Sequence, residues 1–600
     1  MINIMEQKLT KLINKYDIYK YVPNMYAESQ AENILRDLFC NKYKNKKIAI
    51  WGGGWHTYHI LKALDEYENI VAIIDRNPDA VQKFDYGIKV VSPKENISEM
   101  DIVVISSFFS RRDIQLDIMN MFSGVEIIDL YDYFDEAGLF YNAEYYKTAF
   151  VRYDDILIDR LKYNKKRNLQ SLMRLIGDYV AIRDFKNAFF YIDCMDDDEP
   201  ERKRYLEFKE NTIALLEKCK EENARKRNVI INWVDALRYD EINNMPYLSS
   251  LMGNSVFFEN AYTQVNYTSG TMKSILGGVD FIDDELYKTK IEKCLNDEMI
   301  NQLKEANVDL MVVSGHWRTR IEKFSLGIVD LFIRIGRGRN IPCSLIQWWA
   351  LAELYQSHNN MVVICHMIEE THPSYKSGEV DSMSNIGDIE LFNMYKENYE
   401  HISKQIKMGQ EYIDKQLQWY RLYYGQNDVT IYMSDHGQYR DEKPLCVRGL
   451  FHVMFMIVGY GRSYCEQRMF ELKNMGKVLK NIINGEKIKG VFSNCVIAQT
   501  DDPYEPNFWE RIRTSGMPDY ILAYIQKRII ITPYDLYMRL KTGQEFYLRR
   551  DSDKNLIDDE RYIERIEELK EKCGDNFIDV EKEPGYEHMI DFYSKGWKYE

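Results

Sequence analysis

Short apolar runs that end at polar residues recur along the chain, and each predicts a buried strand. The run NVIINWV leads directly into Asp235, and the run TIYM leads into Asp435 with His436 beside it. Runs of this length suit strands that are covered on both faces. Ligands of open α/β sheets bind at the carboxyl ends of the strands. We therefore expect Asp235 and Asp435 to lie where a metal or substrate would bind.

A helical pattern with hydroxyl side chains lies between these two strands. In YTSGTMKSILGG, Thr268, Thr271 and Ser274 are spaced three apart, which aligns them on one helical face. A hydroxyl at a helix start, two strand-end carboxylates and an adjacent histidine together predict an oxygen and nitrogen site for a divalent cation. Since this set lacks sulfur ligands, we expect zinc or manganese. A simpler alternative makes Thr268 only the N-terminal cap of its helix.

The N-terminal part repeats the strand pattern around a glycine-rich turn. KKIAIWGGGWHTYHILKALDEYENIVAIIDRNP follows the strand, turn, helix, strand order of a Rossmann unit, with DIVVISS and VEIIDL as further strands. Gly52 and Gly54 allow a tight turn, and Asp75 ends the second strand where a ribose would bind. Thr57 replaces the third glycine of G-x-G-x-x-G. The turn predicts either a nucleotide or nucleotide-sugar site or a structural module that docks without a ligand.

The patterning divides the chain into four parts. Its 600 residues suggest two to four domains. We expect a helical extension over 1–45, a Rossmann-like domain over 46–147, a charged helical connector over 148–226 and a catalytic domain over 227–600. Alternating runs after residue 500 predict a small antiparallel subdomain within that last part. The fold class is therefore α/β.

Two more strand ends between the cation blocks carry candidate chemistry. In VDLMVVSGHWRTR a strand ends in Gly315-His316-Trp317-Arg318. Arg318 and Arg320 could clamp a phosphoryl or sulfuryl group, and Trp317 could stack on a sugar. MVVICHMIEETHPSY runs into Glu369, Glu370 and His372. His366 lies inside that apolar run, a position more typical of a histidine packed in the core.

Charge and composition limit which binding partners and cellular locations we expect for this chain. Lysine and arginine number 79 against 94 acidic residues, giving a net charge of −15, so nucleic-acid binding is not expected. The ten cysteines form no C-x-x-C pair, which argues against a disulfide framework and a zinc knuckle. No window reaches eighteen apolar residues and the N-terminus lacks a signal-peptide core, so we expect a cytoplasmic chain without a transmembrane anchor.

Four pieces in order resemble the sulfatase-like part of the alkaline phosphatase superfamily, over roughly residues 226 to 570. They are VIINWVDALRYD, MPYLSSLMGNSVFFENAYT, YTSGTMKSILGG and SDHG. The superfamily includes sulfatases, lipoteichoic-acid synthases and phosphoethanolamine transferases, so the resemblance implies a mixed sheet sandwiched by helices. The N-terminal part is similar to Rossmann-like modules of bacterial glycan-biosynthesis enzymes.

The resemblance also implies roles for individual residues. It makes Thr268 the nucleophile and Asp235, Thr268, Asp435 and His436 the metal ligands. His372 matches a family phrase T-H-x-x-Y, and His452 stands where relatives carry a Lys or His, although a strand-edge histidine is the alternative. With Arg318, these histidines would stabilise the transition state or protonate the leaving oxygen. Glu369, His372 and His452 could instead form a second metal site.

The nucleophile favours phosphorus chemistry. Sulfatases convert the Cys or Ser of C/S-x-P-S-R to formylglycine, whereas this chain has Thr268-Ser269-Gly270-Thr271-Met272. Metal coordination would lower the pKa of the threonine hydroxyl. Threonine is the nucleophile of the phosphotransferase branch of this superfamily. The resemblance therefore implies a phosphotransferase that moves a phosphoglycerol or phosphoethanolamine group from a phosphodiester donor to a glycan or sugar acceptor. The alternatives are a phosphodiesterase, phosphonate or sulfate-ester hydrolase, and a non-catalytic scaffold. The sequence leaves the oligomeric state undetermined.

Overall fold

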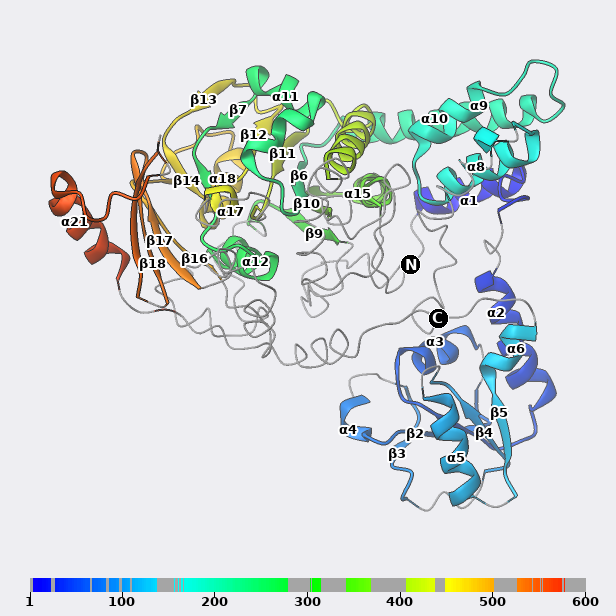
Figure 1. Cartoon of the computed structure of the whole chain (residues 1–600). Helices are drawn as coiled ribbons and strands as arrows, with labels where there is room; N and C mark the ends of the chain where they lie inside the picture. Colours follow the sequence, from blue (N-terminus) through cyan, green and yellow to red (C-terminus); the bar gives the residue numbers. More distant parts are fainter. Residues whose placement is uncertain are drawn as a thin grey trace.

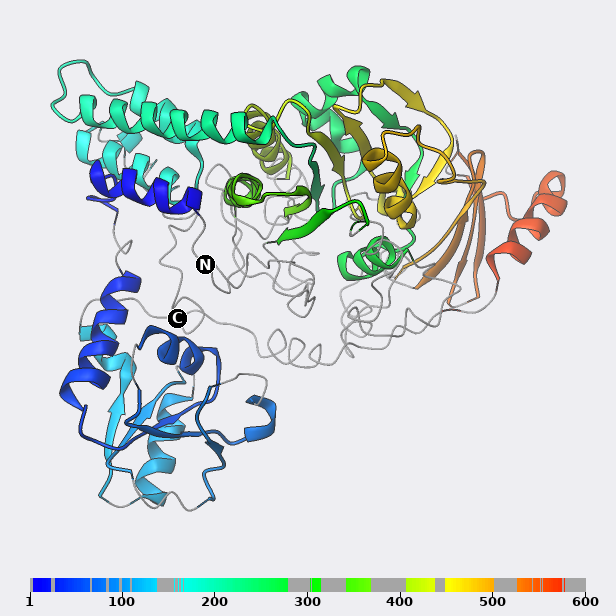
Figure 2. The same cartoon turned by 180° about the vertical axis from the view of Figure 1, so that it is seen from behind.

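Figures 1 and 2 show the computed structural model of the chain from two sides. The structure describes residues 4–22, 27–64, 67–81, 86–95, 100–107, 110–122, 124–136, 156, 160, 163–165, 167–278, 303, 305–314, 342–367, 406–437, 448–500, 526–541, 543–550, 552, 554–574 and 577.

A seven-stranded mixed sheet forms the centre of the larger part of the molecule. Its order is β13-β7-β12-β11-β6-β10-β9, with β11, β6, β10 and β9 parallel and β12 antiparallel to β11. The strands are β6 (Val229–Val234), β7 (Val256–Phe258), β9 (Val308–Ser314), β10 (Asn360–Met367), β11 (Val429–Met433), β12 (Phe455–Val458) and β13 (Tyr464–Glu466). The predicted α/β class is confirmed.

Both faces of this sheet are covered, which explains why β6 and β11 are apolar at every position or nearly so. Alternate residues of β6 enter two different cores, with Ile230 and Val234 on one side and Ile231 and Trp233 on the other. Helices on the first face are α1 (Ile4–Lys15), α8 (Leu169–Ala181), α9 (Phe185–Asp193), α10 (Arg202–Asn223), α15 (Cys343–Gln356) and a helix over 406–421. Helices on the second face are α12 (Thr268–Gly277) and α18 (Met475–Ile483).

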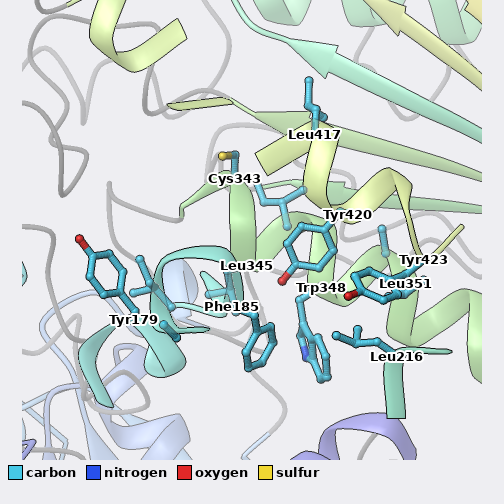
Figure 3. Packing of buried hydrophobic residues seen from close by; sticks show 14 of the residues in the cluster. Tyr179, Phe185, Leu216, Cys343, Leu345, Trp348, Leu351, Leu417, Tyr420 and Tyr423 are labelled. Carbon is cyan, nitrogen blue, oxygen red and sulfur yellow. The ribbon is translucent and has the colours of Figure 1, made fainter. Parts of the chain in front are cut away.

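Large aromatic side chains join the helices of the first face. Figure 3 shows Trp348 of α15 between Phe185, Leu216 and Tyr420, which come from α9, α10 and the helix over 406–421. The Phe185 and Trp348 rings are 5.3 Å apart between centroids. Burying such rings contributes on the order of 2–3 kcal/mol each. The helices therefore share one core with the central sheet.

The segment predicted as one extension over 1–45 is divided between two cores. Residues of α1 and the turn after it, from Met5 to Val22, pack in the core of the first face. Helix α2 (Ala27–Arg36) instead packs with α3 and α6 against the N-terminal sheet. The four-residue spacing of Met5, Leu9 and Ile13 marks an apolar stripe on α1, but it carries no information about which partner covers the stripe.

The N-terminal sheet is parallel, with the order β3-β2-β1-β4-β5. Helix α5 covers one face, and α2, α3 and α6 cover the other. The elements are β1 (Ile48–Trp51), β2 (Ile70–Ile74), β3 (Val90–Val91), β4 (Ile102–Ile105), β5 (Glu126–Asp129), η1 (Asp37–Lys42), α3 (Trp55–Ala63), α4 (Pro78–Val81), α5 (Arg111–Met121) and α6 (Leu130–Glu136).

The C-terminal strands form a separate antiparallel sheet in the order β16-β17-β18-β19, with α21 packed on one face (Figure 1). Its elements are β16 (Val496–Gln499), β17 (Lys527–Ile531), β18 (Asp535–Leu540), β19 (Glu545–Arg549), η9 (Glu560–Tyr562) and α21 (Ile563–Cys573). The remaining short elements are η2 (Tyr239–Asn244), α11 (Pro246–Leu251), η3 (Met252–Asn254), β8 (Ala261–Tyr262), α17 (Arg448–Phe451), β14 (Met469–Glu471), η8 (Leu472–Asn474) and β15 (Phe492–Ser493). Within the described residues, no helix has the length and apolar character needed to cross a membrane.

Candidate metal centre

Two neighbouring parallel strands place their terminal carboxylates side by side. Trp233 of β6 is in register with Met433 of β11, so Asp235 and Asp435, each two residues further on, leave the sheet at the same level. Both carboxylates are buried. The Asp235 N–H donates to the Met367 carbonyl at the end of β10 (2.8 Å), which continues the strand pairing up to the site. Parallel pairing thus brings together two acids that are distant in sequence.

The hydroxyl of Thr268 lies against this pair of strand ends. It donates to Asp235 Oδ2 (2.7 Å) and lies 3.3 Å from His436 Nε2. Thr268 is the first residue of α12, and the N-cap position belongs to Tyr267, whose side chain makes no capping hydrogen bond. The Thr268 side chain is therefore directed at the acidic strand end and does not cap the helix.

The next hydroxyl on the same helical face also serves the site. Thr271 Oγ1 donates to the Asp435 carbonyl (3.2 Å) and lies 3.1 Å from Thr263 Oγ1. This contact attaches α12 to the loop that carries Asp435. Helix α12 ends at Gly277, and the next residue, Gly278, adopts a left-handed conformation (φ +60°) that suits glycine.

Asp235, Asp435 and His436, together called the ligand cluster, converge on one point. One ligand atom from each lies within 4.8 Å of the other two. His436 Nε2 and Asp435 Oδ2 are 3.4 Å apart. Among the described residues, these three form the one set of acidic, histidine or cysteine side chains close enough to hold a metal ion.

Backbone groups orient the Asp435 carboxylate. Its Oδ1 accepts hydrogen bonds from the N–H groups of Ala236 (2.9 Å) and His436 (2.9 Å), whereas its buried Oδ2 accepts none from the described residues. Ala236 reaches Oδ1 in a left-handed backbone conformation (φ +55°), which costs alanine about 1 kcal/mol. The strained residue directly after Asp235 thus fixes Asp435 with Oδ2 facing the ligand cluster.

A hydrogen bond to the backbone also selects the tautomer of His436. Its Nδ1 lies 2.8 Å from the Gly437 carbonyl, which can only accept, so Nδ1 carries the proton. Nε2 then faces Asp435, Asp235 and Thr268. A metal-ligating histidine usually donates one ring N–H to a carbonyl or carboxylate and binds the metal through its other nitrogen.

The electrostatics of the ligand cluster favour a cation. Burial raises the pKa of Asp435, and the nearby Asp235 carboxylate raises it further. Burial lowers the pKa of His436, but the Asp435 and Asp235 carboxylates outweigh burial, so the net pKa lies above its ordinary value of 6.5. Two buried acids that share one site and an acceptor oxygen without a hydrogen-bond partner fit a divalent cation with oxygen and nitrogen ligands.

His366 is the site neighbour that sequence reasoning missed. We predicted a core histidine, and the side chain is fully buried with its ring 5.0 Å from that of Trp233. Its Nε2, however, lies 3.4 Å from Asp235 Oδ2. Because His366 is in register with Trp233 on β6, it shares a sheet face with Asp235. The signal for this contact is the register of β10, which the apolar run alone does not contain.

The structure does not bring His452 into the ligand cluster. Its ring stacks between Tyr239 (3.9 Å between centroids) and Tyr262 (4.8 Å), and its Nε2 lies 2.8 Å from the Glu259 carbonyl. This environment matches the strand-edge alternative. The predicted site residues Arg318 and His372 lie outside the described residues, as do Trp317, Arg320, Glu369 and Glu370.

The predicted cofactor residues of the N-terminal sheet, Gly52, Gly54 and Asp75, lie in and beside the turn after β1, and Asp75 makes hydrogen bonds to the backbone there. Gly52 has φ +117°, and a Cβ there would lie 3.0 Å from the Ser106 carbonyl, whereas a Cβ on Gly54 would meet nothing within 4 Å. Asp75 Oδ2 accepts the Gly53 N–H (2.7 Å) and its Oδ1 accepts the Asn77 N–H (2.8 Å). Gly52 therefore allows a close approach of the turn after β1 to the end of β4, and Asp75 stabilises the turn.

Comparison with known proteins gives matches to separate parts of the chain. A family profile described as C2185-like, N-terminal, matches residues 44–128. No curated protein matches the sequence. Among solved structures, the chain is similar to a phosphonate monoester hydrolase from Silicibacter pomeroyi, with 11% identity and a TM-score of 0.43 over 58% of this chain and 94% of that one.

Two further solved structures are similar at comparable levels. A 2-O GAG sulfatase has 14% identity and a TM-score of 0.43, over 57% of this chain and 90% of its own. A protein in the alkaline phosphatase superfamily from Vibrio parahaemolyticus has 13% identity and a TM-score of 0.39, over 58% of this chain and 86% of its own. The structural neighbours are thus sulfatases, phosphonate monoester hydrolases and a member of the alkaline phosphatase superfamily, all at low identity.

Proposed function

We propose that this protein is a metal-dependent phosphotransferase with Thr268 as its nucleophile. It would transfer a substituted phosphoryl group, of phosphoglycerol or phosphoethanolamine type, from a phosphodiester donor to a glycan or sugar acceptor. The observation that carries the proposal is the position of the Thr268 hydroxyl, 2.7 Å from Asp235 Oδ2 and 3.3 Å from His436 Nε2. This position lets the Thr268 hydroxyl share a cation with the buried Asp235 carboxylate and the oriented His436 ring.

Asp235, Asp435, His436 and Thr268 would hold the cation. When bound, a zinc or manganese ion supplies a lower pKa for the threonine hydroxyl and neutralises charge on the phosphoryl oxygens. The chain itself supplies orientation. Asp235 Oδ2 accepts a hydrogen bond from the Thr268 hydroxyl. The N–H groups of Ala236 and His436 orient Asp435 through its Oδ1. Thr271 attaches α12, the helix that carries Thr268, to the Asp435 carbonyl.

The reaction would proceed in two displacements at phosphorus. In the first, Thr268 Oγ1 forms a bond to phosphorus, the bond to the donor alcohol breaks, and that alcohol leaves with a proton. In the second, an acceptor hydroxyl attacks the same phosphorus, loses its proton, and releases Thr268 with its hydroxyl restored. A hydrolase would share the first displacement and use water in the second, so the identity of the acceptor separates the two activities.

The test combines metal analysis, intact mass and a nucleophile variant. Wild-type protein should bind zinc or manganese, release p-nitrophenol from bis(p-nitrophenyl) phosphate, and gain the mass of the phosphoryl adduct on Thr268. Thr268→Val, which keeps the side-chain shape, should lose the adduct and at least about a thousandfold in rate. Ser250→Ala, which removes a hydroxyl from a residue outside the site, should match wild type.

The outcomes separate the candidate functions. Appearance of a phosphoryl-sugar product when sugars are added supports transfer, whereas release to water alone identifies a hydrolase. A Thr268→Val protein that retains full activity and an adduct elsewhere would overturn the nucleophile assignment. A wild-type protein that binds no metal and cleaves no ester would leave a scaffold as the remaining function.

A further inference from the structure

Arg238 joins the two loops that carry the ligand cluster. It follows Asp235 by three residues, and its side chain is only 8% exposed. Its Nε and Nη2 donate to the two carboxylate oxygens of Asp240 (2.9 and 2.7 Å), an acid that is itself largely exposed. Asp240 thus holds Nε and Nη2 of Arg238, while the rest of the side chain packs in the interior.

The guanidinium of Arg238 lies directly on the backbone of Gly449. A Cβ placed on Gly449 would be 2.7 Å from Arg238 Cζ and 2.9 Å from Nη2. Such distances are shorter than any normal carbon contact, so a larger residue at 449 would have to displace the guanidinium. A side chain at position 449 would therefore move the Arg238 guanidinium away from this contact.

Gly437 is enclosed by the same two groups. A Cβ on Gly437 would lie 1.7 Å from the Gly449 carbonyl oxygen and 3.0 Å from Arg238 Cγ. The Gly437 N–H also donates to the Leu450 carbonyl (2.8 Å). The residue directly after His436 is thus held between the Arg238 stem and the backbone of residues 449 and 450.

This enclosure fixes a group that acts on the ligand cluster. The Gly437 carbonyl accepts the proton of His436 Nδ1 (2.8 Å), which leaves Nε2 directed at Asp435 and Thr268. A shift of Gly437 would release Nδ1 and let the ring rotate. The contacts therefore connect Arg238 to His436 through one intermediate residue.

We propose that Arg238 is a positioning residue for the metal site. By holding Gly437 against Gly449, it keeps the carbonyl in place that selects the His436 tautomer. The inference rests on the proposed metal-dependent function, and it adds a residue that acts on the ligand cluster through Gly437. Outer residues that orient metal ligands typically change metal affinity by about 10- to 100-fold when replaced.

The experiment measures metal binding by the full-length protein, independently of catalysis. Chelator-stripped wild type, Arg238→Met and Arg238→Lys are titrated with Zn²⁺, and the Co²⁺ forms are compared by visible absorption. We expect Arg238→Met to bind Zn²⁺ about 10- to 100-fold more weakly and to show an altered Co²⁺ spectrum. Arg238→Lys, which keeps the stem and charge but lacks the planar face, should lose about tenfold.

Two control variants isolate packing from charge. Arg468→Met removes an arginine with the same forked contact, Nε and Nη2 to Glu466 at 2.9 and 2.7 Å, on a side chain that is 63% exposed. It should bind Zn²⁺ like wild type. Asp240→Asn weakens only the exposed ion pair, so its Zn²⁺ affinity should fall less than about fivefold. Gly449→Ala should reproduce the Arg238→Met loss, and the double variant should add little to it.

The Zn²⁺ titrations and Co²⁺ spectra distinguish failure of the Arg238 inference from failure of the proposed metal site. Folded Arg238→Met with wild-type Zn²⁺ affinity and an unchanged Co²⁺ spectrum would overturn the inference and leave the proposed function intact. If Arg238→Met does not fold, the Arg238→Lys titration decides, and wild-type affinity there overturns the inference. A stripped wild type that binds neither Zn²⁺ nor Co²⁺ would overturn the metal site and this inference together.

Discussion

At the scale of single residues, burial sets how Asp428 titrates. This acid precedes β11 and accepts hydrogen bonds from the N–H groups of Asn228 (3.0 Å) and Gly425 (2.7 Å). Burial raises its pKa from 3.8 to about 6, although these hydrogen bonds oppose the shift. The folded protein therefore binds a proton at Asp428 more tightly than the unfolded chain does.

The sign of the resulting pH dependence follows from that difference. The contribution of Asp428 to the free energy of unfolding is fully present below about pH 4 and is lost as the pH rises through about 6. Between pH 8 and pH 5 it amounts to about 1.4 kcal/mol. Asp428→Asn should remove that increment, seen as a smaller gain in thermal midpoint from pH 8 to pH 5 than in wild type.

A matched control tests whether the increment belongs to burial. Asp559 is partly exposed, and the ion pair with Arg561 lowers its pKa to about 2. Asp559→Asn should therefore leave the difference between pH 5 and pH 8 unchanged. An equal loss in both variants, or none in Asp428→Asn, would contradict the assignment to Asp428.

At the scale of elements, a buried ion pair attaches α1 to the helices of the first face. Glu6 accepts from Arg183 Nη2 and from Trp348 Nε1 (2.7 Å), so one carboxylate joins α1, the α8–α9 turn and α15. Both members of the ion pair are largely buried, with 11% of the Arg183 side chain and 16% of the Glu6 side chain exposed. Their position reflects packing that no local pattern around Glu6 indicates.

Removing one partner of this pair should cost more than removing both. Glu6→Ala leaves a buried guanidinium uncompensated and should lower the free energy of unfolding by about 3 kcal/mol. The double variant Glu6→Ala with Arg183→Met should recover part of that loss because no buried charge remains. Thermal unfolding of the two single variants and the double variant measures the coupling. Strictly additive losses would show that the pair does not interact.

At the scale of the whole molecule, the N-terminal sheet is an insertion in the sequence: its residues follow α1 and precede the helices that α1 contacts. The described residues of its two cores lie between Ala31 and Phe134, whereas Met5 to Val22 and Ile156 belong to the core of the first face. Val22 also packs closely on Gly177 of α8, because a Cβ added to Gly177 would lie 2.3 Å from Val22 Cγ2. The chain thus leaves one core, forms another and returns.

Two deletions should therefore behave differently. Replacing residues 23–155 with a Gly/Ser linker of about 20 residues, which spans roughly 25 Å, should preserve folding and Zn²⁺ affinity. Deleting residues 1–155 also removes Met5, Leu9 and Ile13 from their core, which should cost several kcal/mol at about 1.5–3 kcal/mol per side chain. Zn²⁺ titration and thermal unfolding compare the two. A folded internal deletion that binds no Zn²⁺ would show that the inserted sheet contributes to the site.

The sequence by itself determined the strands, the α/β class and the four side chains around the candidate metal. Asp235, Thr268, Asp435 and His436 each stand at the end of a strand or the start of a helix, and such ends are marked by short-range changes from apolar to polar residues. The carboxyl ends of parallel strands converge by geometry, so their meeting could be predicted without coordinates.

Only the tertiary structure decided which groups support those four. His366 reaches Asp235 because β10 pairs with β6 in one particular register, and Arg238 reaches Gly437 because two loops distant in sequence pack together. Likewise, α1 joins its core across an inserted sheet. Register, loop packing and helix partners depend on contacts between remote segments, and the local periodicity of a sequence carries no information about them.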